Sequence, residues 1–313
     1  MRIVEIKSND ANQRLDKFLT KTYPRLPKSL MYKFIRTKKI KVNRKRGEIS
    51  QILSEGDTIQ LFIPEEFMEN EKDDFYKYLK PVFDTVFEDG NILIVNKPVG
   101  LLCHSDENGG VSQNTLIDQI KSYLWAKGEY IEENENSFAP ALCNRIDRNT
   151  GGLVICAKTA TALRDMNLII KERKLSKYYL CLVKNRPEKD EAVLKGYLVK
   201  DGDNNMVKIY DHDPKLPNAK EIKTKYKYVE QHGDNYLLEV DLLTGRTHQI
   251  RAHLAHIGSP LAGEGKYAQN HEDNGHQALW AYKIVFHDLE GTSLSYLSFR
   301  KIELEKSKIP FLN

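Results

Sequence analysis

Hydrophobic residues in the first part of the chain are spaced as in two short helices followed by strands. A helical segment that begins near Arg14 must end by Pro24, because proline cannot continue a helix interior. After Pro27, apolar side chains recur four residues apart, which predicts a second helix. Alternating residues over 40–43 and 58–63 predict two strands. This segment therefore has the pattern of a small α/β domain.

Beyond residue 81 the pattern is that of a larger domain of mixed structure. Helices are expected over 115–127 and 160–173, and apolar strands over 92–95, 153–157, 178–183 and 236–242. Because crossover helices do not regularly separate these strands, we expect an α+β fold with a mixed, largely antiparallel sheet. The residues between the two segments are acidic and polar, which is typical of a linker. The expected organisation is a small domain over 1–64, a linker over 65–80 and a second domain over 81–313.

Composition and length exclude several classes of protein. The 313 residues are 40% hydrophobic and 29% charged, as in globular proteins, and no apolar stretch approaches the roughly 20 residues that span a bilayer. The N-terminal residues are charged where a signal peptide would be apolar. The four cysteines form no CxxC pair, which argues against a disulfide framework or a zinc knuckle. We expect a soluble, cytoplasmic protein with no membrane partner, and a monomer, since no dimerisation heptad is found.

Positive charge is concentrated at the N-terminus. Residues 1–64 contain fifteen Lys and Arg against six Asp and Glu, a net charge of +9, although the whole chain carries only +4. This imbalance favours a nucleic-acid-binding domain over an ordinary solvated surface. The basic residues near the end of the second helix and in the next turn could hold phosphates without reading sequence: Lys38, Lys39, Lys41, Arg44, Lys45 and Arg46.

The stretch from Asn144 to Gly152 has the composition of a tight polar loop before an apolar strand. Asp147 lies between Arg145 and Arg148, whose charges favour an ionised carboxylate. Such a carboxylate suits a nucleophile or a general base that acts on an anionic substrate. An Asp whose side chain only caps the turn fits the same composition. The residues alone leave both interpretations open.

A second informative stretch, residues 243–258, predicts a helix. Thr247 is the expected N-cap, and Gly258 is expected to end the helix. Ile250, Leu254 and Ile257 have the spacing of its buried face.

Basic residues gather at the start of this expected helix. Arg246, His248 and Arg251 would add their charge to the positive end of the helix dipole and form an anion site. Arg251 could equally form a structural ion pair.

Metal and nucleotide sites are disfavoured by spacing. His248, His253 and His256 are five and three residues apart, whereas a helical HExxH site needs two His four apart with a Glu beside the first. The segment GEGK at 263–266 lacks the GxxxxGK spacing of a phosphate loop. We therefore expect neither a metal nor a cofactor.

Two sets of motifs resemble known families. In the first sixty-five residues, RLDKFL, KSLMYKFIRTKKIKVN and a GD before the last strand resemble the RNA-binding domain named after ribosomal protein S four. Residues 82–290 resemble the RluA/RluC/RluD-type RNA pseudouridine synthases, with the motifs in the family's order. These motifs are NKPxGL at 96–101, RIDxxTxGL at 145–153, KxYL at 177–180 and TGRTHQIRAHLAHIGSPLAGEGKYA from residue 244.

The second resemblance implies the pseudouridine synthase fold and an isomerase that needs no cofactor. Asp147 would be the catalytic carboxylate, attacking the anomeric carbon or removing a ribose proton. Tyr179 would stack on the base, and Arg251 would pair with Asp147. The target uridine must be flipped out of the RNA, and unstacking costs a few kcal/mol. Arg145 would enter the space that the uridine leaves.

The same motifs imply further RNA contacts from Lys97, Arg246 and His248. The resemblance narrows the partner to RNA of the bacterial large ribosomal subunit, 23S, either free or in an assembly intermediate. An RluC-like target is favoured over an RluD-like or a tRNA target. A non-catalytic assembly factor that binds ribosomal RNA is the rival from another class, and a metal-dependent nuclease is a second rival.

Four positions depart from the family's usual pattern. Asn144 stands where His is usual, and Gly151 where Ser is common. Glu264 replaces a frequent Asp, and Trp280 a frequent His. None of these departures removes a residue of the implied mechanism, and they leave open which uridine is modified.

Overall fold

The computed structural model describes residues 1–69, 74–105, 114–201, 206–268 and 276–313, which form two compact units. Residues 70–73 of the expected linker lie outside this description. One unit contains Met1–Pro81, Ile117–Ala141 and Ala157–Arg164. The other contains Val82–Leu116, Leu142–Cys156 and Asp165–Asn313. None of the described helices is both long and apolar enough to cross a membrane.

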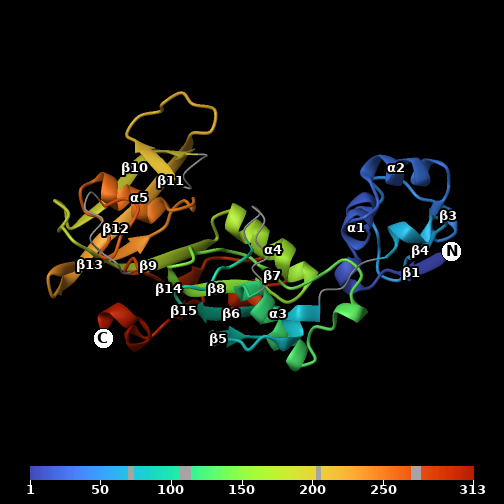
Figure 1. Ribbon diagram of the computed structural model, residues 1–313, viewed down its shortest axis with the longest axis horizontal. Coiled ribbons are helices and arrows are strands. Elements are labelled where there is room, and N and C mark those ends of the chain that lie inside the picture. The colour runs from blue at the N-terminus through green and yellow to red at the C-terminus, as the bar shows by residue number, and fades with distance from the viewer. Residues whose placement is uncertain (70–73, 106–113, 202–205, 269–275) are drawn as a thin grey trace. The chain divides into compact units, whose positions relative to one another are not determined.

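The N-terminal residues fold as a four-stranded antiparallel sheet beside two helices, in blue in Figure 1. The strand order is β1 (Arg2–Glu5), β4 (Thr58–Leu61), β2 (Ile40–Val42) and β3 (Lys45–Arg46), and the helices are α1 (Leu15–Thr22) and α2 (Lys28–Arg36). Both helices and both strands expected here are confirmed. Their apolar faces form one core, which includes Phe18, Leu19, Met31, Ile35 and Ile59. The turn between β2 and β3 places Asn43 and Arg44 at φ 50° and 67°, the geometry of a tight two-residue hairpin.

A buried carboxylate joins this small sheet domain to a segment far along the chain within the same unit. Asp10 has no exposed surface. It accepts hydrogen bonds from Ser137 N at 3.1 Å, Ser137 Oγ at 2.7 Å, Asn136 Nδ2 at 2.7 Å and Lys7 N at 3.3 Å. Nearby, Gln13 Nε2 donates to Ser137 Oγ at 2.8 Å. Asp10 is therefore a multiply bonded anchor and not a surface charge.

This unit also contains several short helical turns. They are η1 (Ser8–Asp10), η2 (Glu65–Phe67), η3 (Asp74–Tyr78) and η4 (Glu132–Asn134). Part of the expected linker is packed rather than loose, because Tyr76 is buried and its ring lies 6.1 Å from that of Tyr130.

The larger unit is built on an eleven-stranded sheet with the order β11-β10-β12-β13-β9-β14-β8-β6-β5, in which β15 also pairs with β14 and β7 with β8. The pairs β10–β12, β12–β13, β13–β9 and β14–β9 are antiparallel, whereas β14 and β8 are parallel. The expected α+β fold with a mixed, largely antiparallel sheet is therefore confirmed. The strands are β5 (Asp84–Glu88), β6 (Ile92–Lys97), β7 (Ala141–Leu142), β8 (Gly151–Ala157), β9 (Leu175–Val183), β10 (Glu191–Asp201), β11 (Met206–Tyr210), β12 (Lys220–His232), β13 (Asn235–Asp241), β14 (Leu279–Phe286) and β15 (Lys301–Glu303).

The helices that follow residue 81 are α3 (Leu116–Ala126), α4 (Ala160–Lys171) and α5 (Gln249–His256). Helix α5 packs against β11 and β12 (Figure 1). It is buried continuously from Gln249 to Leu254, so it is enclosed on most sides. The expected face was only partly right, because Ile250 and Leu254 are buried whereas Ile257, just past the helix, is 36% exposed. The chain ends in short turns, η5 (Ser295–Leu297), η6 (Lys306–Lys308) and η7 (Pro310–Leu312).

Two glycines allow β8 to lie close against β14. Gly151 is opposite Trp280 and Gly152 is opposite Ala281 in the parallel pair. A Cβ atom at Gly151 would overlap the Trp280 ring, and one at Gly152 would overlap the Ala281 backbone. Gly152 also has φ of +115°, which strongly favours glycine. Because β8 packs closely against β14, the position of the preceding loop, which contains Asp147, is fixed relative to the sheet.

Candidate active site

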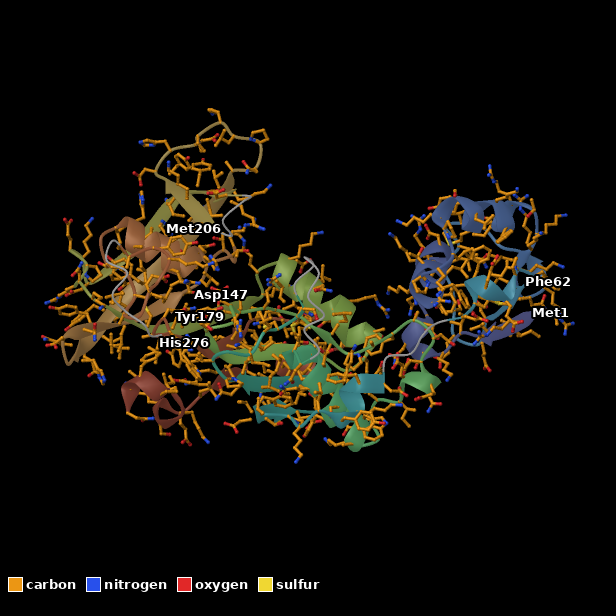
Figure 2. All side chains as sticks on the ribbon, viewed as in Figure 1. Met1, Phe62, Asp147, Tyr179, Met206 and His276 are labelled. Carbon is orange, nitrogen blue, oxygen red and sulfur yellow. The ribbon has the colours of Figure 1, made fainter. Side chains whose placement is uncertain are left out.

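A pocket of about 270 Å³ opens in the larger unit where the loop before β8, strand β9 and the N-terminal end of α5 converge. Asp147 and Tyr179 both line it (Figure 2). Its walls also include four basic residues that the sequence proposed for the site: Arg145, Arg246, His248 and Arg251. Residues up to 136 positions apart in the chain, Cys143 and Leu279, thus line one cavity.

Asp147 projects a half-buried carboxylate into this pocket. Its Oδ2 atom lies 3.2 Å from Arg251 Nη1 and 3.8 Å from His248 Nε2, and the side chain is 26% exposed. The turn itself is closed by the backbone, since Thr150 N donates to Asp147 O at 3.1 Å. The alternative that this side chain merely caps the turn is therefore not what the described contacts show. The carboxylate is left facing the cavity.

Arg251 joins two carboxylates. Its Nε and Nη2 atoms donate to Glu264 Oε2 and Oε1 at 2.8 and 2.7 Å, which leaves Nη1 to bond Asp147. A two-pronged contact of this kind fixes the plane of a guanidinium group. The pair with Glu264 is the structural ion pair considered for Arg251 in the sequence, and it aims the remaining nitrogen at Asp147.

Glu264 has no exposed side-chain surface and was not assigned a role from the sequence. Burial raises the pKa of Glu264, but the bonds and the charge of Arg251 outweigh burial, so that this pKa is below its usual value. The Lys266 N–H adds a bond of 2.9 Å to Oε1. Glu264 is therefore held ionised. The sequence showed Glu264 only as part of a failed phosphate loop and as a departure from a frequent Asp, and the signal that could have identified its role is a charged residue between two glycines.

His248 is buried near the Asp147 carboxylate and does not form part of an exposed anion-binding site. It is 9% exposed, and Nδ1 lies 2.8 Å from the hydroxyl of Tyr267. Burial is the main cause that lowers the pKa of His248 below its usual value, so the ring is neutral at pH 7. A neutral imidazole cannot serve as the phosphate-binding cation expected from the sequence. His248, with φ of 53°, is also the N-cap of α5, so the expected N-cap at Thr247 was wrong by one residue.

Tyr267 is a second functional candidate that the sequence reasoning missed. Its hydroxyl meets His248, accepts from Val207 N at 3.1 Å, and its ring centroid lies 5.5 Å from the guanidinium carbon of Arg251. Burial raises the pKa of Tyr267 to about 12, so its hydroxyl keeps its proton. The residue supports both His248 and Arg251.

Tyr179 lies on β9 in the pocket wall and is only 5% exposed. Burial, followed by the charge of Asp147, raises the pKa of Tyr179 well above its usual value. The side chain is therefore a neutral phenol at all physiological pH values. A neutral aromatic ring beside a carboxylate is suited to contact a planar base.

Lys97 does not have the exposed position expected of an RNA-binding residue. Its side chain is fully buried, and Nζ donates to Pro98 O at 2.8 Å, Leu101 O at 2.8 Å and Arg148 O at 3.1 Å. Burial lowers the pKa of Lys97 to about 8. This correction has a clear physical reason: the ammonium group ties the turn after β6 to the loop that contains Asp147, and no surface remains for a phosphate.

Asn144 holds the same loop from its other end. Its Oδ1 accepts from Ile155 N at 2.8 Å, and its Nδ2 donates to Leu153 O at 3.3 Å. Trp280 contributes from β14, where its Nε1 donates to Asn96 Oδ1 at 3.2 Å. Three of the positions that depart from the family's pattern, Asn144, Gly151 and Trp280, therefore support the loop and the sheet beneath it.

The remaining basic candidates are accessible. Arg145 and Arg246 are exposed at the pocket. In the N-terminal unit, the side chains at the end of α2 and around the β2–β3 hairpin are exposed except for half-buried Lys41, and they comprise Lys38, Lys39, Lys41, Arg44, Lys45 and Arg46. Lys39 and Lys41 lie over the rings of Phe34 and Phe62, at 5.3 and 5.2 Å from the centroids.

The other two histidines of the α5 segment have partners of their own. His253 is buried and bonds Thr224 Oγ1 at 3.0 Å, whereas His256 meets Asp211 Oδ1 at 2.9 Å. Within the described part of the chain, no three His, Cys, Asp or Glu side chains are grouped to hold a metal ion.

The chain is similar to known proteins over most of its length. Residues 91–256 match the family model described as RNA pseudouridylate synthase. An uncharacterized RNA pseudouridine synthase of Mycoplasma genitalium is 33% identical over 97% of this chain and 95% of its own length. Ribosomal large subunit pseudouridine synthase C of Vibrio cholerae is 30% identical over 87% of this chain and 82% of its own. The structure of human RNA pseudouridylate synthase domain containing 1 aligns with a TM-score of 0.57 at 18% identity, over 78% of this chain and 89% of that one.

Proposed function

The chain belongs to the RNA pseudouridylate synthase family, and from that premise we propose that it converts uridines of bacterial large-subunit ribosomal RNA to pseudouridine, with Asp147 as the catalytic carboxylate. The observation that carries the proposal is the position of Asp147, whose carboxylate faces a pocket while Arg251 holds it from behind. Tyr179 supplies a neutral aromatic wall in the same pocket.

The reaction needs only side chains that bind the RNA, attack the sugar and transfer a proton. The bond between the anomeric carbon and N1 of uracil breaks, a bond from that carbon to C5 forms, and the proton leaves C5 while N1 gains one. Because product and substrate are isomers, no oxidant, reductant or second substrate is consumed. Asp147 can act as nucleophile at the anomeric carbon or as base toward a ribose proton.

A uridine can reach this carboxylate only after it leaves the base stack. Arg145 is exposed at the pocket and long enough to fill the space that the base leaves in the RNA. Tyr179 then receives the uracil ring against its own. These are the roles we propose for the two residues.

The choice of large-subunit ribosomal RNA is supported by the relatives named for that substrate, such as the Vibrio cholerae protein. The excess of basic residues over 1–64 supports a large structured RNA as partner. We propose the small N-terminal domain, the linker and the catalytic domain with the boundaries expected from the sequence, and an RluC-like target.

Pseudouridine mapping of large-subunit ribosomal RNA tests the proposal. RNA from cells with and without the gene is labelled with carbodiimide and read by primer extension. We expect stops at specific uridines to vanish with the gene and to return with the wild-type chain but not with Asp147→Asn. That isosteric change should leave RNA affinity within a few-fold. Substantial modification by the Asp147→Asn variant contradicts the proposed role of Asp147. An unchanged ribosomal RNA pattern contradicts the proposed substrate.

A non-catalytic assembly factor remains the competing function. It predicts that purified protein forms no pseudouridine in any RNA although it binds ribosomal RNA tightly. Release of tritium from RNA labelled at uracil C5 measures the reaction directly, and release that depends on Asp147 excludes this rival.

A further inference from the structure

A half-buried lysine in the pocket wall has no part in the chemistry described above. Lys177 lies on β9 two residues before Tyr179, and both side chains line the pocket. Its ammonium group lies against the loop before α5, because a Cβ atom built on Gly245 would be 3.6 Å from Lys177 Nζ. The ammonium group is thus beside Gly245, which lines the same pocket.

This lysine lacks a counterion. In the described parts of the chain, the Lys177 ammonium forms neither a hydrogen bond nor an ion pair, unlike the buried amine of Lys97 with its three carbonyls. Burial lowers the pKa of Lys177. Removing a charged group from water without a partner is costly. The arrangement is explained if a ligand supplies the missing anion.

The charges around Asp147 show why such a cation is needed. Asp147 and Glu264 are both acidic, Arg251 bonds both of them, and the buried Lys97 ammonium also acts on Asp147 through its charge, while His248 is neutral. The cations next to the carboxylates are therefore already paired with them. An RNA strand carries a negative phosphate on each side of the nucleotide that enters. Cations that are not paired with protein carboxylates are needed in the wall to attract these phosphates.

We propose that Lys177 binds a phosphate that borders the target nucleotide, and that this contact seats the ribose beside Asp147. The inference rests on the proposed function, since it assigns a subsite of the same pocket. Arg145 and Arg246 are exposed at the pocket, whereas Lys177 is the sheltered cation next to Tyr179. A phosphate at Lys177 replaces the lost hydration of the ammonium and fixes the sugar to which it is bonded.

The salt dependence of RNA binding tests the contact without any product being formed. The probe is a 5′-phosphorylated penta-uridylate with a fluorophore, bound by the full chain and followed by anisotropy across salt concentrations. Each phosphate contact with a single strand contributes about 0.7 to the slope of log affinity against log salt. We expect Lys177→Met to lower that slope by about 0.7, and Lys177→Arg to preserve it. Lys195→Met, which removes an exposed lysine of β10, should leave it unchanged. An unchanged slope in Lys177→Met, or an equal loss in Lys195→Met, overturns the proposal.

Chemical labelling of the wild-type chain gives a readout that does not depend on a variant folding. Acetic anhydride labels Lys177, and peptide mass spectrometry measures the extent with uridine, uridine 5′-monophosphate or uridine 3′-monophosphate at equal concentration. Greater protection by either monophosphate than by uridine supports a phosphate subsite. Equal protection by uridine, or protection by none of the three, overturns it. Failure of the proposed function appears instead as absent pseudouridine, a separate measurement.

Discussion

Glu264 is the residue through which Arg251 is held in place, although it has no contact with the pocket itself. Glu264→Gln keeps the shape of the side chain and removes its charge, so that the buried guanidinium of Arg251 loses the carboxylate that bonds it at two atoms and keeps only Asp147. Breaking a buried pair in this way destabilises a protein by about 3 kcal/mol or more. We expect a loss of that size in the free energy of unfolding and a lower kcat with KM changed little. Glu303→Gln, at a surface pair with Lys301, is the matched control and should lose under about 1 kcal/mol. Equal losses in the two variants would contradict this account.

The same pair predicts how stability changes with pH. Burial raises the pKa of Glu264, but Arg251 outweighs it and the pKa in the folded chain lies below the ordinary 4.5. The unfolded chain therefore binds the proton first as pH falls. The stabilisation is complete above about pH 4.5 and is lost as pH drops through the lower folded value. In chemical denaturation between pH 6 and 3, wild type should lose stability more steeply than Glu264→Gln, and parallel curves would refute this.

Gly151 and Trp280 lie so close together that a side chain at position 151 does not fit beside the indole ring of Trp280. A side chain at 151 overlaps the indole ring, and overpacking of this kind costs about 1–3 kcal/mol. We expect Gly151→Ser alone to lower the melting temperature and Trp280→His alone to leave a cavity. The double variant should be more stable than the sum of the two losses implies. A double-mutant cycle measures the coupling, and strict additivity would mean that the ring moves aside.

At the level of single residues, the sequence identified Asp147 as the candidate reacting carboxylate, but it did not predict the positions of some neighbouring residues. Asp147 was visible because arginines and glycines surround it in a short loop. Lys97 was expected to contact RNA because it belongs to the NKPxGL motif, and its burial by segments far along the chain has no local signal. The bond between Glu264 and Arg251 joins residues thirteen apart across a turn, so their spacing did not reveal it.

Among the elements, the short segment around Ser137 is joined to the first residues of the chain by hydrogen bonds. Asp10 receives its hydrogen bonds while fully buried. Asp10→Ala leaves those donors unsatisfied, at a cost of roughly 1–3 kcal/mol for each buried group. We expect faster amide exchange at Ser137 and around Lys7, with little change in the strands of the larger sheet. Glu55→Ala, at an exposed position, is the control. Unchanged exchange at Ser137 would show that Asp10 is not the anchor.

Elements with strong periodicity were predictable, and their partners were not. The apolar run of β8 and the four-residue spacing in α2 are local properties of the sequence, and both elements are present. The start of α5 was misplaced because His248 takes a left-handed conformation, which few non-glycine residues adopt. The parallel pairing of β8 with β14 depends on contacts over more than a hundred residues, which no local pattern encodes.

For the whole molecule, the uneven distribution of charge predicts how RNA binding responds to salt. Arg44, Lys45 and Arg46 are exposed at the β2–β3 hairpin. Replacing all three by Gln should weaken binding to a large-subunit ribosomal RNA transcript and reduce the salt slope by up to about 3, since each duplex phosphate contact contributes about 0.9. The control replaces Lys171, Lys189 and Lys195, which are exposed in the larger unit. An equal reduction in the control would place the RNA-binding surface elsewhere.

The tight fit between Gly151 and Trp280 also restricts the order in which these positions can change over generations. A side chain gained at 151 while the indole is present meets an immediate steric penalty, whereas loss of the indole first leaves only an unfilled space. Descendants of a chain with this pair can therefore reach the serine–histidine combination by one order of substitution more easily than by the other. The presence of glycine at 151 therefore indicates that an aromatic ring occupies the position opposite it.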